Sequence, residues 1–272
     1  MLKGMKVILI GLLCLLAAAP AALAGGKVVI KGSTTVLPVA QAASEAYMKL
    51  HKDVNISLSG GGSGDGIKAL IDKSTDIANS SREMKKQETD LAKSKGVNPT
   101  AHTVAIDAIV PIVNPKNKVK DLSIDQLSQI YQGKITNWKE VGGENLAIVV
   151  ISRDSSSGTY ESWGHLVLNG AKVTPRAQLQ ASNGAIVQAI SKNRYAIGYI
   201  GIGYLNKSVQ AVAVNGVAAS AKTAISKEYP VARPLYMYTD GTPKGDTEGF
   251  IKFLLSKKGQ EIVKKTGFVP IK

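Results

Sequence analysis

Apolar and polar residues alternate along the first part of the chain in an order that predicts strands followed by helices. Residues 27–31 place three apolar residues between two lysines, which is typical of a buried strand. After the polar residues 32–35, apolar side chains recur every three or four positions through residues 36–50, which is the spacing of an amphipathic helix. The same order then returns, with a strand at 54–58, a glycine-rich loop at 60–66, a helix from Ile67 and a short strand at 76–78.

A long apolar run at residues 103–114 predicts a strand that ends before Pro115. The helical pattern that follows stops at Gly133, and we expect a second unit of the fold to begin in this region. Its predicted elements are a strand at 147–152, a polar loop at 153–158, a helix from Thr159, a helix at 185–191, strands at 196–200 and 209–214, a polar surface segment at 215–227, a strand at 234–239, and one final amphipathic helix containing Phe250, Phe253, Leu254, Ile262 and Val263. Strands that alternate with helices predict an α/β protein with largely parallel sheets.

The first 24 residues have the pattern of a cleavable secretory signal peptide. Lys3 and Lys6 precede an apolar run at residues 7–19, and the small-residue site Ala22-Leu23-Ala24 follows it. We therefore expect residues 1–24 to be removed and the mature chain to start at Gly25. A membrane anchor and a lipoprotein attached through Cys14 are less favoured alternatives. Since Cys14 is the only cysteine, the exported chain would fold without a disulfide.

Composition and charge narrow the function classes. With 44% hydrophobic residues, 27 Gly and 10 Pro in 272 residues, collagen-like and wholly disordered chains are excluded. The formal charge is +14, and loss of Lys3 and Lys6 would leave +12. A basic protein suits an anionic small ligand, nucleic acid or an acidic membrane surface. Many basic residues come singly or in short groups on predicted helical segments, where a solvated face is the better interpretation; examples are Lys85, Lys86, Lys93, Lys95, Lys257, Lys258, Lys264 and Lys265.

Three loops have the composition of an anion site. They are residues 32–35, 62–64 and 153–159, and each joins a predicted strand to a predicted helix. A helix N-terminus offers unpaired N–H groups, glycine lets an anion approach the backbone, and serine or threonine adds a hydroxyl donor. Each loop alone could be a simple helix cap or turn. Three such loops, one with an arginine that can bind an oxyanion through two nitrogens, favour a site.

Six segments together give the mature chain a resemblance over nearly its full length to the phosphate-binding proteins of high-affinity phosphate ABC transporters. They are residues 32–38, 62–67, 76–82, 131–138, 153–159 and 249–255. The resemblance implies a type II periplasmic-binding-protein fold of the α/β class, with a ligand cleft between two α/β lobes. Lobe I would comprise residues 25–108 and 233–272 and lobe II residues 109–232, with hinge segments near 104–113 and 228–238.

The resemblance also implies a set of phosphate-binding residues. Matching positions are Thr34 or Thr35, between which the alignment does not choose, and Ser63, Ser81, Arg153, Ser157, Gly158 and Thr159. Some relatives have an aspartate where this chain has Ser81, and that aspartate accepts a proton from the bound phosphate. We expect Arg82, the next residue, to lie on the surface and Asp154 to orient Arg153 through an ion pair.

The function implied is that of a periplasmic receptor, not an enzyme, that binds inorganic phosphate and delivers it to the membrane permease subunits of an ABC importer. We expect a monomer without cofactor, metal or nucleic-acid partner. The alternative is a secreted phosphate-ester hydrolase or phosphotransferase that uses the same anion site. Against it, the chain lacks a Gly-x-x-x-x-Gly-Lys-Ser/Thr phosphate loop, residues 61–65 miss the nucleophile-elbow pattern, and the histidines 51, 102 and 165 lack metal-ligand spacing.

Overall fold

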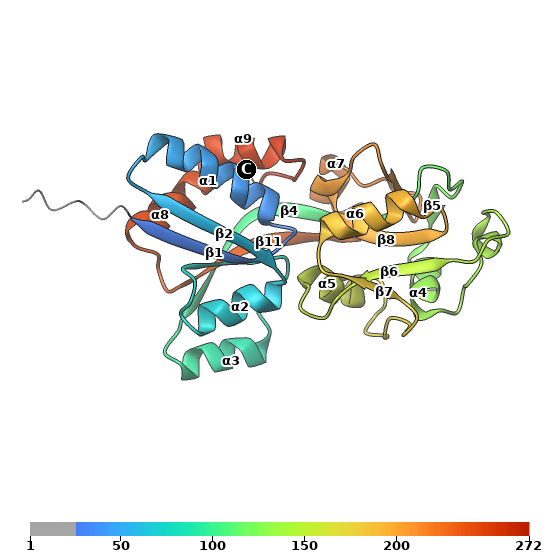
Figure 1. Ribbon diagram of the computed structural model, residues 1–272, viewed down its shortest axis with the longest axis horizontal. Helices are drawn as coiled ribbons and strands as arrows, with labels where there is room; N and C mark the ends of the chain where they lie inside the picture. The colour runs from blue at the N-terminus through green and yellow to red at the C-terminus, as the bar shows by residue number, and fades with distance from the viewer. Residues whose placement is uncertain (1–25, 272) are drawn as a thin grey trace, which may run out of the picture.

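The structure, a computed structural model, describes residues 26–271, and its elements form two lobes along one long axis (Figure 1). The predicted signal peptide and Cys14 lie outside the described residues. Lobe I contains β1 (Lys27–Ser33), α1 (Leu37–Leu50), β2 (Asn55–Gly61), α2 (Ser63–Ile71), β3 (Ile77–Ser80), α3 (Lys86–Ser94), β11 (Ala232–Asp240), α8 (Gly245–Leu255) and α9 (Lys257–Lys265). Lobe II contains β5 (Asp121–Leu122), α4 (Ile124–Gln132), η1 (Trp138–Val141), β6 (Val149–Arg153), α5 (Gly158–Leu166), β7 (Gln178–Gln180), α6 (Asn183–Lys192), β8 (Ala196–Gly201), η2 (Ile202–Tyr204), β9 (Gln210–Ala211), β10 (Ala213–Val214) and α7 (Ala221–Ile225).

One sheet runs through both lobes in the strand order β2-β1-β3-β11-β4-β8-β6-β7, with β9 also paired to β4. The strand β4 (Pro99–Val113) is long enough to belong to both lobes. Up to Ala108 it pairs antiparallel with β11, and from Ile109 onward it pairs antiparallel with β8. The strands β1, β2 and β3 are parallel neighbours, and so are β6, β7 and β8. The predicted α/β class is confirmed.

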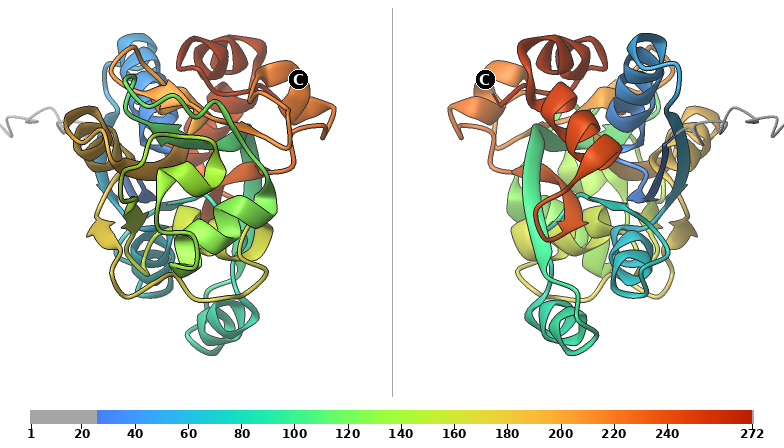
Figure 2. Two further views of the ribbon diagram at one scale, coloured as in Figure 1. Left: turned by 90° about the vertical axis from the view of Figure 1, so that its right-hand side faces the viewer. Right: turned by 90° about the vertical axis from the view of Figure 1, so that its left-hand side faces the viewer.

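Helices cover both faces of the sheet in lobe I. The helices α1, α8 and α9 lie on one face and α2 and α3 on the other (Figure 2). Side chains alternate between the faces of a strand, so each face has its own apolar cluster. Ile30 and Phe250 belong to the first cluster, and Leu70 and Tyr238 belong to the second.

Lobe II is built on a single large apolar cluster of residues from 108 to 231, joined by Val269 near the C-terminus. Its centre is aromatic. Trp163 of α5 stacks on Tyr199 of β8 with ring centroids 4.4 Å apart, and Tyr131 of α4 packs edge-on against Trp163 at 5.1 Å. This packing fixes the position of α5, the helix whose first residues reach the boundary with lobe I.

The structure differs from the predicted elements in several places. The strand expected at 209–214 is two short strands, β9 and β10, which pair with β4 and β5 respectively. The single C-terminal helix is two helices, because Ser256 is extended (φ −72°, ψ 166°) and its hydroxyl caps α9 by accepting from Gly259 N. The helix α3 lies where Lys85, Lys86, Lys93 and Lys95 were expected on a helical segment, but no bounds were predicted for it, since Ala92 is its one buried residue. The polar surface segment 215–227 contains the short helix α7. No helix in residues 26–271 has the length and apolar content needed to cross a bilayer.

Candidate functional site

Four loops bring polar side chains to the boundary between the lobes. In lobe I they follow β1, β2 and β3, whose carboxyl ends meet at one edge of the sheet because the strands are parallel. In lobe II the loop between β6 and α5 faces them. All the predicted site residues are buried here, namely Thr34, Thr35, Ser63, Ser81, Arg153, Ser157, Gly158 and Thr159.

Short-range hydrogen bonds shape these loops. The Ser33 hydroxyl accepts from Thr35 N at 3.1 Å, which turns the chain after β1. Asp65 accepts from Gly62 N at 2.8 Å and so caps α2. Ser157 accepts from Tyr160 N at 3.3 Å as the N-cap of α5, so the simpler interpretation, a helix cap, holds for its side chain. The N-termini of α2 and α5 therefore both point at the boundary.

The hydroxyl groups from the two lobes meet directly. Thr35 Oγ1 of lobe I lies 2.9 Å from Thr159 Oγ1 of lobe II. Within lobe I, the Ser63 hydroxyl lies 3.3 Å from the Ser81 hydroxyl and accepts from Ser81 N at 3.0 Å. Gly158 approaches this pair so closely that a Cβ atom on it would lie 2.4 Å from Ser63 Oγ. The lobes are thus in contact across the site.

Arg153, at the end of β6, is 1% exposed and supplies a buried positive charge. Its Nε donates to the carbonyl of Gln180 at 3.0 Å and its Nη2 to the carbonyl of Ala181 at 2.9 Å. These bonds fix the guanidinium but do not neutralise it. Burial lowers the pKa of Arg153, and the negative charge of Asp154 opposes that shift.

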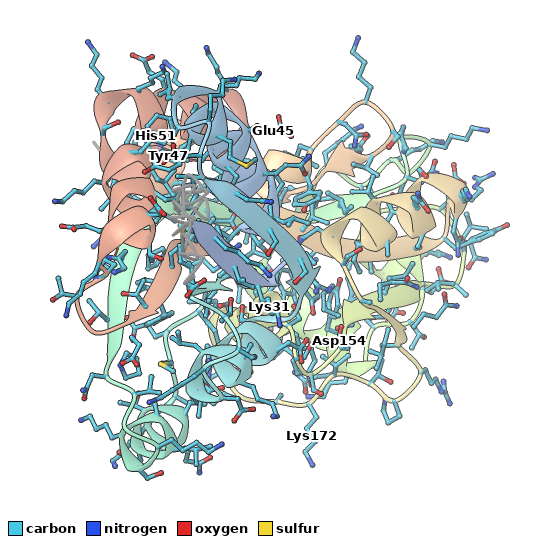
Figure 3. The ribbon with its side chains drawn as sticks, turned by 60° about the vertical axis from the view of Figure 1, so that its left-hand side comes forward. Lys31, Glu45, Tyr47, His51, Asp154 and Lys172 are labelled. Atoms are coloured by element: carbon cyan, nitrogen blue, oxygen red, sulfur yellow. The ribbon has the colours of Figure 1, made fainter. Side chains whose placement is uncertain are left out.

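The predicted ion pair between Asp154 and Arg153 is wrong. Asp154 lies on the lobe II loop beside lobe I (Figure 3), but its carboxylate accepts from the backbone N and the hydroxyl of Ser156, at 2.9 and 2.6 Å. An aspartate readily bonds two residues ahead in its own turn, and both of these local bonds go to one carboxylate oxygen, Oδ1. In the same turn, the Ser156 carbonyl accepts from Gly64 N of lobe I at 3.0 Å.

The predicted surface position of Arg82 is also wrong. Its side chain is 7% exposed and its Nη1 and Nη2 each donate to Glu88 at 2.7 Å. Its Nε also forms an ion pair with Glu161 of lobe II at 2.9 Å. These acids lie 6 and 79 positions further along the chain, so the local sequence gives little sign of the pairing.

Two polar residues of lobe II that were not predicted also reach the first loop of lobe I. Asn183 Nδ2 donates to both Thr34 Oγ1 and Thr35 Oγ1 at 3.1 Å, and Tyr204 donates to the Thr34 carbonyl. Burial raises the pKa of Tyr204 to about 12, so its hydroxyl stays a donor at neutral pH. Asn183 is the first residue of α6, and the Ser182 cap before it is the signal that could have indicated this loop.

An unpredicted buried ion pair lies beside the hydroxyl groups, on the two strands that connect the lobes. Arg233 of β11 contacts Asp107 of β4 at 2.9 Å, and also donates to Thr159 Oγ1 at 2.8 Å and to the Gly158 carbonyl at 3.1 Å. Burial raises the pKa of Asp107 and lowers that of Arg233, while their mutual attraction opposes both shifts. The sequence feature that could have indicated this ion pair is Asp107 itself, an acidic residue inside the apolar run 103–114.

The histidines lie apart from this site. His51 stacks on Tyr47 at the end of α1 (Figure 3), with ring centroids 4.2 Å apart, and His102 bonds the Thr239 hydroxyl. His165 is exposed near the end of α5. Within residues 26–271, no three His, Cys, Asp or Glu side chains group closely enough to hold a metal ion.

Taken together, the boundary presents hydroxyl, backbone N–H and guanidinium donors from two α/β lobes linked by β4 and β11. Donors from both lobes that converge on one buried point can surround a tetrahedral oxyanion and replace its water. Fold and site therefore define a two-lobed solute-binding protein.

Comparison with known proteins gives the family. Residues 17–258 match the family model described as a PBP superfamily domain. The phosphate-binding protein PstS of Bacillus subtilis (strain 168) is 34% identical over 91% of this chain and 82% of its own length, and PstS of Borreliella burgdorferi is 35% identical over 89% of each chain. A solved structure of a substrate-binding protein assigned to a phosphate ABC transporter of Clostridium perfringens, with bound phosphate, is 37% identical. It covers 91% of this chain and 100% of its own, with a TM-score of 0.85. The chain belongs to the PstS family of phosphate-binding proteins, and its fold is the expected type II periplasmic-binding-protein fold.

Proposed function

We propose that this protein is a receptor that holds one inorganic phosphate between its lobes and delivers it to an ABC importer. The proposed donors are the hydroxyl and backbone groups of Thr34, Thr35, Ser63, Ser81, Ser157, Gly158 and Thr159 together with the guanidinium of Arg153. The main supporting observation is that hydroxyl groups from two lobes meet, Thr35 with Thr159, next to the loop that Arg153 begins. Arg153 is buried, and among residues 26–271 its guanidinium bonds backbone carbonyls and forms no ion pair with a carboxylate. Such a site offers charge and hydrogen bonds to a dehydrated anion.

The lobes are proposed to comprise residues 25–108 with 233–272 and residues 109–232. Two observations support these bounds. The strand β4 exchanges β11 for β8 between Ala108 and Ile109, and the apolar cluster of lobe II draws on residues 108–231 with one addition from the C-terminal segment. The segments around β4 and β11 would then form the hinge, so that opening separates Thr35 from Thr159.

The proposed partners are the permease subunits of the importer, and the proposed location is the periplasm. The resemblance to a substrate-binding protein of a phosphate ABC transporter supports the partners, and the signal-like residues 1–24 support the location. We propose that the receptor acts as a monomer and binds no nucleic acid. The hydrolase alternative is weaker, because Asp107, the carboxylate beside the cluster, accepts from Arg233 and from Ile202 N at 3.0 Å and offers no free base.

Calorimetric titration of the mature chain with phosphate and with sulfate tests the proposal, together with small-angle scattering of the free and saturated protein. We expect phosphate to bind with one-to-one stoichiometry and to reduce the radius of gyration, because ligand contacts in both lobes favour the closed state. An assay for release of phosphate from a phosphate monoester should detect no turnover. Absence of phosphate binding, or binding without compaction, would overturn the proposed receptor.

A further inference from the structure

A cluster of charged side chains joins the lobes outside the hydroxyl site. We call it the closure cluster, and it consists of Arg82, Lys85 and Glu88 of lobe I and Glu161 of lobe II. The Glu161 carboxylate lies between two cations, 2.9 Å from Arg82 Nε and 2.9 Å from Lys85 Nζ. The side chains of Arg82 and Glu161 are 7% and 14% exposed, so water screens this pair less than a surface pair.

The partners in this cluster are divided unequally between the lobes. Arg82 holds Glu88 through two nitrogens and also donates to the Glu83 carbonyl, all within lobe I. Its charge therefore stays compensated when the lobes separate. Among the described residues, both ion pairs of the Glu161 carboxylate cross to lobe I. Opening would remove both of them and return Glu161 to water.

The closure cluster shares its elements with the hydroxyl site. Glu161 lies in the first turn of α5, two residues after Thr159, and Arg82 directly follows Ser81. Between them, Ser162 Oγ donates to the Ser81 carbonyl at 3.4 Å. Any movement that separates Thr159 from lobe I therefore also separates Glu161 from Arg82 and Lys85.

We propose that Glu161 is a closure residue, which raises the affinity for phosphate by stabilising the closed state without touching the anion. This inference rests on the proposed function. A group that favours the closed state raises the population able to hold the ligand and so lowers the apparent Kd.

Substitution of Glu161 separates this proposal from direct electrostatics by the sign of its effect. Removing a negative charge close to an anion site should tighten anion binding through Coulomb's law. The closure proposal gives the opposite result, and Glu161→Gln should weaken phosphate binding by about 3- to 10-fold, within the usual range of coupling between sites. The matched control is Glu83→Gln. Glu83 lies in the same region but accepts from Tyr236 Oη at 3.2 Å within lobe I, so the control should bind as tightly as wild type or tighter.

Energy transfer between two dyes gives a second measure that does not need phosphate. Because Cys14 is the only cysteine and lies in the predicted signal peptide, Lys93→Cys in lobe I and Lys172→Cys in lobe II, both exposed, can carry the dyes. Without ligand, Glu161→Gln should shift the transfer efficiency toward the open state relative to wild type and Glu83→Gln.

The two measures distinguish the possible failures. If wild type binds no phosphate, the proposed function fails, and the dye measurement alone decides the role of Glu161. If Glu161→Gln binds phosphate as tightly as wild type or tighter, or if its transfer efficiency without ligand equals that of wild type, the closure proposal is wrong. A melting temperature close to that of wild type confirms that the variant is folded.

Discussion

Gly158 offers the most direct test of the closed arrangement, because the three atoms nearest to a single added carbon all belong to the other lobe. A Cβ atom at position 158 would lie 2.4 Å from Ser63 Oγ, 2.8 Å from Ser81 Oγ and 3.0 Å from Arg82 Cγ. All three neighbours belong to lobe I, whereas Gly158 begins α5 of lobe II. Its φ is not positive, so alanine fits its backbone. Gly158→Ala should therefore fold normally and fail to close fully.

The expected size follows from those distances. A carbon and an oxygen need roughly 3.3 Å, so the lobes must separate by close to 1 Å, or Ser63 must rotate and lose the hydrogen bond from Ser81 N. Forcing an extra carbon into a packed site costs about 1–3 kcal/mol. If that cost falls only on the closed state, the Kd for phosphate rises by about 5- to 150-fold.

Calorimetric titration gives the Kd, and thermal unfolding of the ligand-free protein gives the stability. Gly164→Ala is the matched control, because Gly164 lies on the same helix and a Cβ there meets nothing within 4 Å. The control should bind phosphate like wild type and melt at the same or a higher temperature, since alanine favours helix more than glycine. The reasoning is refuted if Gly158→Ala binds phosphate like wild type, or if it mainly lowers the melting temperature of the free protein.

Three further predictions concern charge at the site. Arg153→Ala should raise the Kd for phosphate by about 10- to 150-fold, because a charge-assisted hydrogen bond contributes about 1.5–3 kcal/mol. The control Arg194→Ala, at an exposed ion pair with Glu144, should leave the Kd unchanged. Equal titration curves for the two variants would contradict the role of Arg153. Asp107→Asn should lower the free energy of unfolding by about 3–5 kcal/mol in denaturant titrations, because Arg233 would stay buried without its partner. The loss should be smaller when Arg233→Met is added. An unchanged unfolding midpoint for Asp107→Asn would show that the pair is not buried as described. Ser81→Asp should weaken sulfate more than phosphate, because sulfate has no proton to share with the new carboxylate, while wild-type affinity for phosphate should hold or rise between about pH 6 and 8 as the dianion forms. Wild-type binding that collapsed above pH 7 would show that a carboxylate already accepts that proton.

The fold could be predicted from the sequence where the signal is local. The strand, loop and helix order around β1 and α1 is visible because buried side chains recur at the helical period, such as Val39, Ala43 and Tyr47. The same reasoning gave no bounds for α3, which buries only Ala92. It also missed the break at Ser256, the residue that ends one helix and whose hydroxyl caps the next. Pairing of β4 with two different strands could not be read from its apolar run, because the run has one pattern throughout.

The candidate site also contains residues that the sequence predicts and residues that it does not. Its loop residues could be predicted, because glycine and hydroxyl residues between a strand and a helix have a local signature. Thr35 does meet Thr159, and Ser63 meets Ser81. Residues from distant parts of the chain that bond these loops could not be predicted. Asn183 bonds a threonine 148 positions away, and Arg233 bonds one 74 positions away. Both contacts depend on how the lobes pack, for which a single sequence carries no periodic signal.

The three buried arginines at the lobe boundary differ in how their charges are compensated. Arg82 is compensated by Glu88 and Glu161, and Arg233 is compensated by Asp107. Of these three buried arginines, Arg153 alone contacts only backbone carbonyls among residues 26–271. Carbonyl dipoles orient a guanidinium, but they leave its net charge in place, and a buried charge without a counter-ion is costly. An anion between the lobes would supply that counter-ion, so the site would be complete only when the ligand is bound.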